Sequence, residues 1–170
     1  MTTVEVVRTY LELRDPKELR PAELSDPSVR FEKKARCNAD EYLALYTAVG
    51  SQWAWRDRLA WTAGQLAEYL AKPSLSIWAC VVDGETAGYF ELDRHDDGAV
   101  EIVYFGLIGK FFGRRLGAAM LTRAVREAWA LGAERVWLHT CTLDSPRALP
   151  NYIARGFTPV RSVTYTEEFP

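Results

Sequence analysis

Residues 109–117 read GKFFGRRLG and join a predicted β-strand over residues 99–108 to a predicted helix over residues 113–131. The amides of a first helical turn have no partner within the helix, so this end carries a positive partial charge and can hold an anion that glycine allows to approach closely. Three cations lie in or just before that turn: Lys110, Arg114 and Arg115. Each opposes the helix dipole by about 0.3–1 kcal/mol. The segment therefore indicates either a polyanion-binding turn or a solvated basic turn.

The predicted helix that follows has a single apolar face. Its apolar positions recur at a period of 3.6 residues: Gly117, Ala118, Leu121, Ala124, Val125 and Ala128. The opposite side is predicted to hold the polar residues: Thr122, Arg123, Arg126 and Glu127. Gly132 is expected to end the helix. The pattern predicts a helix that packs one face against a sheet.

Strands and helices alternate along the rest of the chain. Apolar and β-branched runs bounded by turns predict strands over residues 4–13, 29–36, 75–83, 86–93, 134–141 and 157–168. Capping residues and glycines predict helices over residues 38–50, 62–71 and 146–155. The order predicts an α/β fold with a mixed, mostly antiparallel twisted sheet flanked by helices. We expect one domain over residues 1–170, in which an N-terminal extension strand and linker (1–28) precede the core (29–170).

The composition is that of a globular protein, since 48% of the 170 residues are hydrophobic and 26% are charged. The formal net charge is −2, so no global basic field favours binding to nucleic acid. No apolar run approaches the ~20 residues of a membrane span, and the first residues lack the pattern of a signal peptide. We therefore expect a cytoplasmic protein with no membrane partner. Three widely spaced cysteines and two histidines predict no metal site.

The segment at the helix start also carries a family motif. Residues 112–117 (FGRRLG) fall on the pattern [Q/R]-x-x-G-x-[G/A] and resemble the GNAT superfamily of acetyl-CoA-dependent N-acetyltransferases. Gly117 matches, whereas Phe112 replaces Gln or Arg and Arg115 replaces glycine. The resemblance implies that coenzyme A pyrophosphate lies against Phe112, Gly113, Arg114, Arg115, Leu116, Gly117 and Ala118. Arg115 either clashes with this cofactor or donates to a phosphate.

A second element of the resemblance lies upstream, on the predicted strand. Residues 101–105 (EIVYF) resemble the strand E-I-V-F-C of the histone-acetylating branch, at the family's distance from the loop. The resemblance implies that Glu101 is the general base that takes a proton from the attacking amine, directly or through water. The alternative is a strand glutamate that faces outward. Phe105, Gly106 and Leu107 are implied to pair with the pantetheine arm, with the Leu107 N–H as donor to the thioester carbonyl.

The third element is residues 145–157 (SPRALPNYIARGF), which resemble the family block N-x-x-A-x-x-x-Y-x-x-x-G-F. The matching residues are Ala148, Tyr152, Gly156 and Phe157, while Ser145 stands where asparagine is usual. The resemblance implies that Tyr152 is the general acid that protonates the leaving thiolate, and that Ser145 and Ala148 contact the cofactor. The alternative for Tyr152 is a core tyrosine packed on the sheet.

Residues 51–61 (SQWAWRDRLAW) are expected to shape the pocket for the acceptor amine. Four residues are candidates for holding an ammonium group through aromatic faces or negative charge: Trp53, Trp55, Asp57 and Glu91. The tryptophans are alternatively core residues, which is the interpretation favoured for Trp61. Arg56 and Arg58 instead indicate a carboxylate on the acceptor, such as an amino acid or a peptide terminus.

The two histidines are assigned no catalytic role. His139 lies on the predicted strand over residues 134–141 and is interpreted as structural, although it is an alternative base near the cleft. His95 lies in a turn next to Asp96 and is expected at the surface.

The three elements occur in the family's order and spacing. They predict an N-acetyltransferase that moves an acetyl group from acetyl-CoA to a primary amine of a small molecule or peptide, by direct attack and without a metal. The alternative is a non-catalytic acyl-CoA-binding sensor or interaction module of the same fold, favoured by Phe112, Arg115 and Ser145. The strand over residues 4–13 is open to two arrangements: it extends its own sheet, or it pairs with a second subunit in a homodimer.

Overall fold

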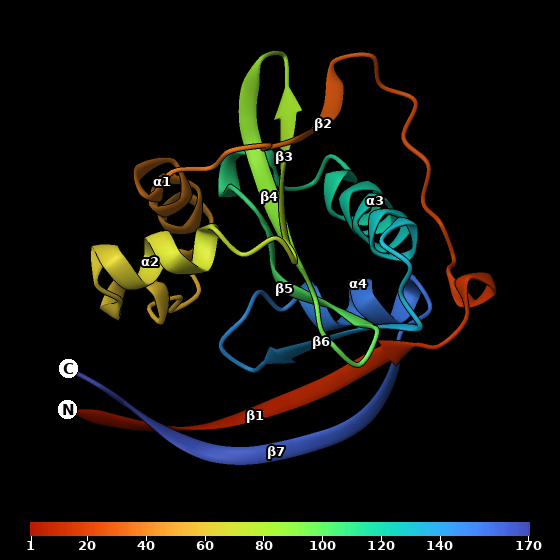
Figure 1. The fold of residues 1–170 in the computed structure, drawn as a ribbon. Helices are drawn as coiled ribbons and strands as arrows, with labels where there is room; N and C mark the ends of the chain where they lie inside the picture. The colour runs from red at the N-terminus through yellow and green to blue at the C-terminus, as the bar shows by residue number, and fades with distance from the viewer.

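The computed structural model describes residues 1–170, and its seven strands form one sheet in the order β2-β3-β4-β5-β6-β1-β7 (Figure 1). The strands are β1 (Thr2–Leu13), β2 (Val29–Lys33), β3 (Leu75–Val82), β4 (Glu85–Arg94), β5 (Ala99–Leu107), β6 (Arg135–Cys141) and β7 (Thr158–Phe169). Strands β2 to β5 form an antiparallel meander, and only the pair β5–β6 is parallel. The predicted mixed, mostly antiparallel α/β sheet is confirmed.

Four α-helices cover the two faces of the sheet. They are α1 (Ala39–Gly50), α2 (Ala63–Leu70), α3 (Leu116–Ala130) and α4 (Ala148–Ala154). In Figure 1, α1 and α2 lie on one side of the sheet, and α3 and α4 lie on the other. Each side has its own core, with twenty buried residues on the α3 side and six on the α1 side. No helix combines the length and the apolarity that a membrane crossing requires.

Helix α3 begins three residues later than the sequence predicts, at Leu116. Gly113 (φ 81°) and Arg115 (φ 62°) both adopt left-handed backbone conformations, which a right-handed helix excludes. A short 3₁₀ turn over Gly109–Phe111 precedes them. The chain therefore turns sharply twice between the end of β5 and the first turn of α3.

Thr122 is buried, whereas the sequence predicts that it lies on the outer side of α3. Its hydroxyl donates to the Ala118 carbonyl at 2.9 Å and accepts from the Ala22 N–H at 2.9 Å. The connection from β1 to β2 passes alongside α3 at this point (Figure 1). The periodicity of a helix cannot reveal a distant segment that covers its outer side, and this explains the wrong prediction.

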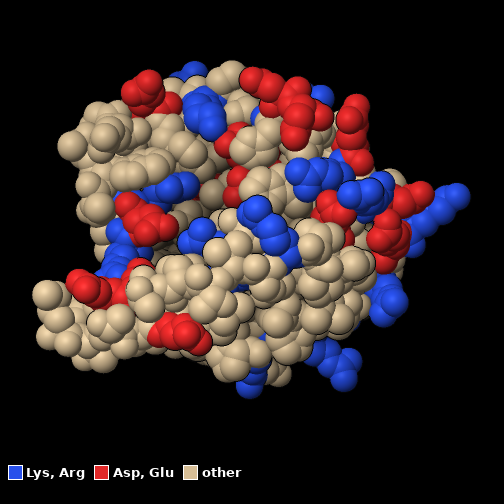
Figure 2. Space-filling view, turned by 90° about the horizontal axis from the view of Figure 1, so that it is seen from below, with Lys and Arg blue, Asp and Glu red and all other residues tan.

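Strand β1 extends its own sheet, where it lies between β6 and β7. Residues 8–13 pair with β6, and almost the whole strand pairs with β7, so both ends of the chain lie at the same end of this ribbon (Figure 1). The face seen from below has acidic and basic side chains interspersed, without a large patch of one sign (Figure 2).

Candidate active site

The site is centred on a split between β5 and β6. These parallel strands pair only from Ala99–Arg135 to Glu101–Trp137, although β5 and β6 continue beyond that point. Strand β4, in contrast, stays paired with β5 as far as Leu107. The two parallel strands therefore diverge, and Glu101 lies at the apex of the opening.

The split leaves backbone groups of β5 without a strand partner. The Ile108 N–H donates to the Ala87 carbonyl of β4 at 2.8 Å. Because N–H groups alternate between the two edges of a strand, the N–H of Leu107 points to the opposite edge, where β6 has diverged. The edge of β5 thus offers unpaired backbone donors to a ligand in the split.

A cavity of about 700 Å³ occupies this split and reaches both faces of the sheet. The residues predicted from the sequence that line it are Trp53, Trp55, Asp57, Glu101, Phe105, Gly106, Leu107, Phe112, Gly113, Arg115, Leu116, Gly117, Ala118, Ser145, Ala148 and Tyr152. Two predicted residues, Arg114 and Glu91, are absent from the cavity wall. Arg114 is exposed to solvent on the outside of the loop.

The loop before α3 fits a pyrophosphate group. Arg115 is the N-cap residue of α3, and its side chain makes no capping hydrogen bond, so the first amides of the helix have no such partner. A Cβ atom on Gly113 would meet nothing within 4 Å, which leaves room for an anion beside the backbone. Arg115 occupies the left-handed position, and this explains why the family motif has glycine there.

Tyr152 lies opposite β5 on the α3–α4 side of the cavity. Its ring packs edge-on against Phe105, with 6.0 Å between ring centroids, and its side chain is only 6% exposed. Burial raises the pKa of this phenol, and the nearby Asp144 carboxylate raises it further. The hydroxyl therefore keeps its proton at neutral pH. Asn151 fixes the position of α4 by donating from Nδ2 to the Gly117 carbonyl at 3.2 Å.

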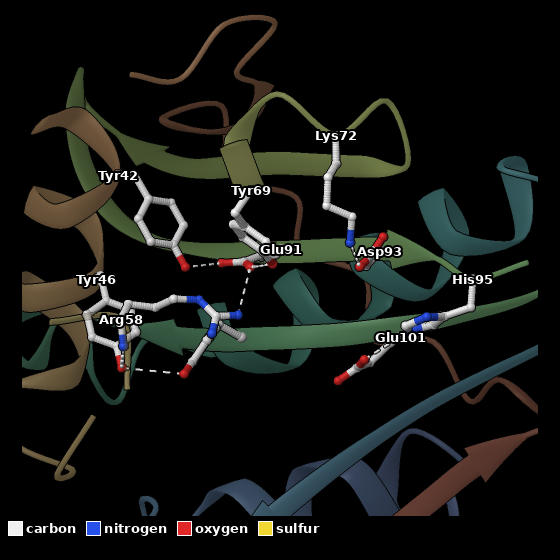
Figure 3. A network of polar contacts seen from close by, with 10 residues as sticks. Tyr42, Tyr46, Arg58, Tyr69, Lys72, Glu91, Asp93, His95 and Glu101 are labelled. Atoms are coloured by element: carbon white, nitrogen blue, oxygen red, sulfur yellow. Dashed lines mark hydrogen bonds and ion pairs between the residues drawn. The ribbon is translucent and has the colours of Figure 1, made fainter. Parts of the chain in front are cut away.

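Glu101 is paired with His95, which the sequence predicted to be only a surface residue. Glu101 Oε1 and His95 Nε2 lie 3.0 Å apart (Figure 3), and the imidazole stacks on Trp137 at 5.9 Å. The Glu101 side chain is 14% exposed and that of His95 is 40% exposed. The turn between β4 and β5 folds His95 back over the start of β5, because its N–H donates to the Ala99 carbonyl. The pair thus links the apex of the split to solvent.

Glu91 is fully buried, contrary to the prediction that it contacts the acceptor. The Tyr42 hydroxyl donates to Glu91 Oε1 at 2.7 Å, the Tyr69 hydroxyl donates to Oε2, and Arg58 lies 4.0 Å away (Figure 3). Burial raises the pKa of this carboxyl group. Glu91 lies on a central strand beneath α1 and α2, so the tyrosines of these helices cover it.

The predicted tryptophans form an aromatic wall on the α1–α2 side. Trp53 lies next to Phe112, with 6.4 Å between ring centroids, and Trp55 packs against Tyr104 at 4.8 Å. Both tryptophans border the cavity. Trp61 packs on the smaller core, as the sequence predicts, and so does Trp55, but Trp61 does not border the cavity.

Further cavity residues come from β1, β6 and β7, and of these the sequence singles out only His139, as an alternative base near the cleft. They are Arg8 on β1, His139 and Cys141 on β6, and Tyr165 and Glu167 on β7. Desolvation by the cavity walls lowers the pKa of His139, and the neighbouring Arg8 lowers it further. No local motif marks these residues, because their position depends on the placement of β1 between β6 and β7.

Residues 39–157 match a family model described as the acetyltransferase (GNAT) family, which covers more than half of the chain. Among curated proteins, an uncharacterised N-acetyltransferase of Mycobacterium tuberculosis is 33% identical over 96 residues, which are 56% of this chain and 61% of the relative. A Mycobacterium bovis protein with the same description matches equally. The chain thus spans 61% of the length of the curated relatives that it matches.

Solved structures share the fold at low sequence identity. A GCN5-related N-acetyltransferase from Kribbella flavida has a TM-score of 0.65 at 18% identity, over 96% of this chain and 58% of that chain. An aminoglycoside acetyltransferase from a soil metagenomic sample has a TM-score of 0.63 at 12% identity, over 76% of this chain and 88% of that chain. These likenesses show the architecture alone.

Proposed function

Because the chain belongs to the GNAT family of acetyltransferases, we propose that it moves an acetyl group from acetyl-CoA to a primary amine of a small molecule or peptide. The observation that carries this proposal is the single cavity in the split between β5 and β6. It brings the loop before α3, the carboxylate of Glu101 and the phenol of Tyr152 to one space. When bound there, acetyl-CoA supplies a thioester whose acyl carbon the amine attacks directly.

In this proposal, backbone groups on the α3–α4 side of the cavity bind acetyl-CoA, the acetyl donor. The free amides of the first turn of α3 and the open space beside Gly113 receive the pyrophosphate. Arg115, which borders the cavity, donates to a phosphate oxygen. The unpaired Leu107 N–H donates to the carbonyl oxygen and stabilises the negative charge that develops there.

Proton transfers complete the proposed reaction. Glu101 accepts a proton from the attacking amine, directly or through water, and the C–N bond forms as the C–S bond breaks. His95, which contacts Glu101 and is partly exposed, passes this proton to solvent. The phenol of Tyr152 keeps its proton at neutral pH and donates it to the thiolate sulfur.

Thiol release from acetyl-CoA with a panel of primary amines tests this function. We expect turnover with at least one amine, and loss of most of it in Glu101→Gln and Tyr152→Phe. A non-catalytic acyl-CoA-binding module would bind acetyl-CoA, release no thiol with any amine, and bind equally well in both variants. That result would replace acetyl transfer with the sensor function.

A further inference from the structure

Three arginines border the α1–α2 side of the cavity, and two of them already have carboxylate partners. Arg56 Nη2 donates to Glu167 Oε1 at 2.7 Å. Arg58 Nη2 lies 4.0 Å from Glu91 Oε2, and its guanidinium covers the Trp61 ring at 4.0 Å. The sequence suggested these two arginines as carboxylate ligands, but both already face carboxyl groups of the protein.

Arg8 is the third arginine of this wall, and it forms no ion pair. Its Nη2 donates to the Tyr165 hydroxyl at 3.3 Å, and its guanidinium lies over the Tyr165 ring at 5.1 Å. Its Nε is buried and has no hydrogen-bond partner, which also holds for the Nε of Arg58. Arg58, however, faces the Glu91 carboxyl group, whereas Arg8 faces no carboxyl group in an ion pair. Buried donors in folded proteins are almost always paired, so a vacant guanidinium donor beside a cavity indicates an anion that arrives with a ligand.

The register of the sheet places Arg8 and Glu101 on the same face. Glu101 is opposite Trp137 of β6, and Arg8 is opposite Cys141 of β6. Trp137 and Cys141 are four residues apart on one strand, so their side chains and those of their partners share a face. The Glu101–Trp137 pair and the Arg8–Cys141 pair, called the two rows below, are separated by about 13 Å along β6. Arg8 and Glu101 thus lie towards opposite ends of one cavity wall.

The charges between these two residues make the wall dipolar. His139 lies between the two rows, and desolvation lowers its pKa, so the imidazole adds no positive charge there at neutral pH. Asp93, opposite Glu101 on β4, is paired with Lys72 at 2.7 Å. The wall therefore offers carboxylates at Glu101 and at the exposed Asp57, and an unpaired cation at the Arg8 end.

We infer that the acceptor is a small amine that also carries a carboxylate, and that Arg8 binds this carboxylate. This inference rests on the proposed acetyl transfer. The vacant Nε and the adjacent Nη2, which has two N–H groups and also contacts the Tyr165 hydroxyl, can provide two parallel donors, the arrangement that suits a carboxylate. The amino group lies towards Glu101, and the distance between the two rows favours an acceptor whose amine and carboxylate are several bonds apart.

The test compares matched acceptors by thiol release. ω-Amino acids of increasing chain length are paired with amines of the same length that end in a methyl or carboxamide group. We expect kcat/KM to be ~10-fold higher for the carboxylate member at the preferred length, because charge-assisted hydrogen bonds are the stronger class. This ratio should fall towards one in Arg8→Gln and stay unchanged in Arg30→Gln, which replaces an exposed arginine of β2 that pairs with Glu32 outside the cavity wall.

Arg8→Lys, which keeps the charge but loses the paired donors, should give an intermediate ratio. Calorimetric titration with acetyl-CoA checks that each variant is folded. Equal kcat/KM within every matched pair, or an unchanged preference in Arg8→Gln, overturns the carboxylate site while acetyl transfer stands.

Absence of thiol release with every amine overturns acetyl transfer instead. Calorimetric titration of the coenzyme A complex with ω-amino acids then decides the carboxylate site alone. Binding that Arg8→Gln abolishes supports the site, and absence of binding to the wild-type complex overturns it.

Discussion

The two sides of the cavity are built in different ways. The α3–α4 side comes from two short segments of the chain, within residues 112–118 and 143–152, and in the proposed function it holds acetyl-CoA mainly through backbone amides. The α1–α2 side is assembled from single side chains on β1, β5, β6, β7 and the loop over residues 53–58. Backbone amides persist when side chains change, so we expect the α3–α4 side, the donor side, to bind acetyl-CoA even though Phe112 and Arg115 depart from the family motif. The proposed function therefore predicts that mutations can separate acetyl-CoA binding from catalysis.

Glu101→Gln gives the largest expected effect, because it removes the proposed base without altering the donor side. We expect kcat at saturating substrates to fall by ~10²–10³-fold, within the usual range for general base catalysis. The dissociation constant of acetyl-CoA should change by less than ~2-fold, which is a small change in binding free energy. Glu5→Gln, at an exposed position of β1, serves as the control. An unaffected kcat and an unaltered pH–rate profile would assign the proton to solvent or to another base.

Tyr152→Phe removes only the phenolic oxygen, and it should lower kcat by ~100-fold, at the low end of the range for general acid catalysis. Acetyl-CoA affinity should stay within ~2-fold, because the ring still packs on Phe105 and Phe157. Tyr10→Phe, outside the cavity wall, is the matched control. Stopped-flow or steady-state thiol release gives kcat, and calorimetry gives the affinity. Turnover equal to that of the wild type would remove Tyr152 as the acid.

Arg115→Gly distinguishes the effect of the left-handed backbone at this position from the effect of the arginine side chain. Glycine relieves the left-handed strain at this position, so the free energy of unfolding should rise by about 1 kcal/mol. Acetyl-CoA should bind ~10-fold more weakly, because a donor to phosphate is lost. Arg114→Ala, at the neighbouring exposed position, should change neither quantity. Tighter binding in Arg115→Gly would show instead that the arginine obstructs the cofactor.

The smallest expected effect is that of Glu91→Gln on the pH dependence of the protein's stability. The pKa of Glu91 is raised in the folded protein. Its protonation therefore stabilises the folded state fully at pH values below its pKa in the unfolded chain, about 4.3. This stabilisation is lost as the pH rises through the pKa of Glu91 in the folded protein. The stability of the wild type relative to Glu91→Gln should therefore fall as pH rises, by at most about 1.4 kcal/mol per pH unit. Denaturant unfolding at several pH values measures the difference in free energy of unfolding between the two proteins. A difference that stays constant with pH would refute the raised pKa of Glu91.

The donor side was predictable from the sequence because its residues are close together along the chain. Within the loop over residues 112–118 and the block over residues 145–157, the spacing of the residues along the chain is enough to identify the motif. The structure places nearly all their predicted residues in one cavity wall. Arg114 is the exception in the loop. Its neighbours take left-handed backbone conformations, and this turn leaves the Arg114 side chain exposed.

The acceptor side was less predictable, because its contacts depend on which strands become neighbours. Arg8 reaches the cavity only because β1 lies between β6 and β7. His95 reaches Glu101 because the turn between β4 and β5 sets their register. Glu91 has the charge of an ammonium ligand, but the tyrosines of α1 and α2 cover it completely. Charge and residue type indicate candidates, whereas burial and register decide which of them face the ligand.

The most direct test of the central claim is a calorimetric titration of acetyl-CoA into the wild-type protein and into Glu101→Gln. The claim is that the split between β5 and β6 holds the donor through groups that are independent of the catalytic side chains. We predict micromolar binding with similar affinity for both proteins. No detectable binding to the wild-type protein at millimolar acetyl-CoA would contradict it.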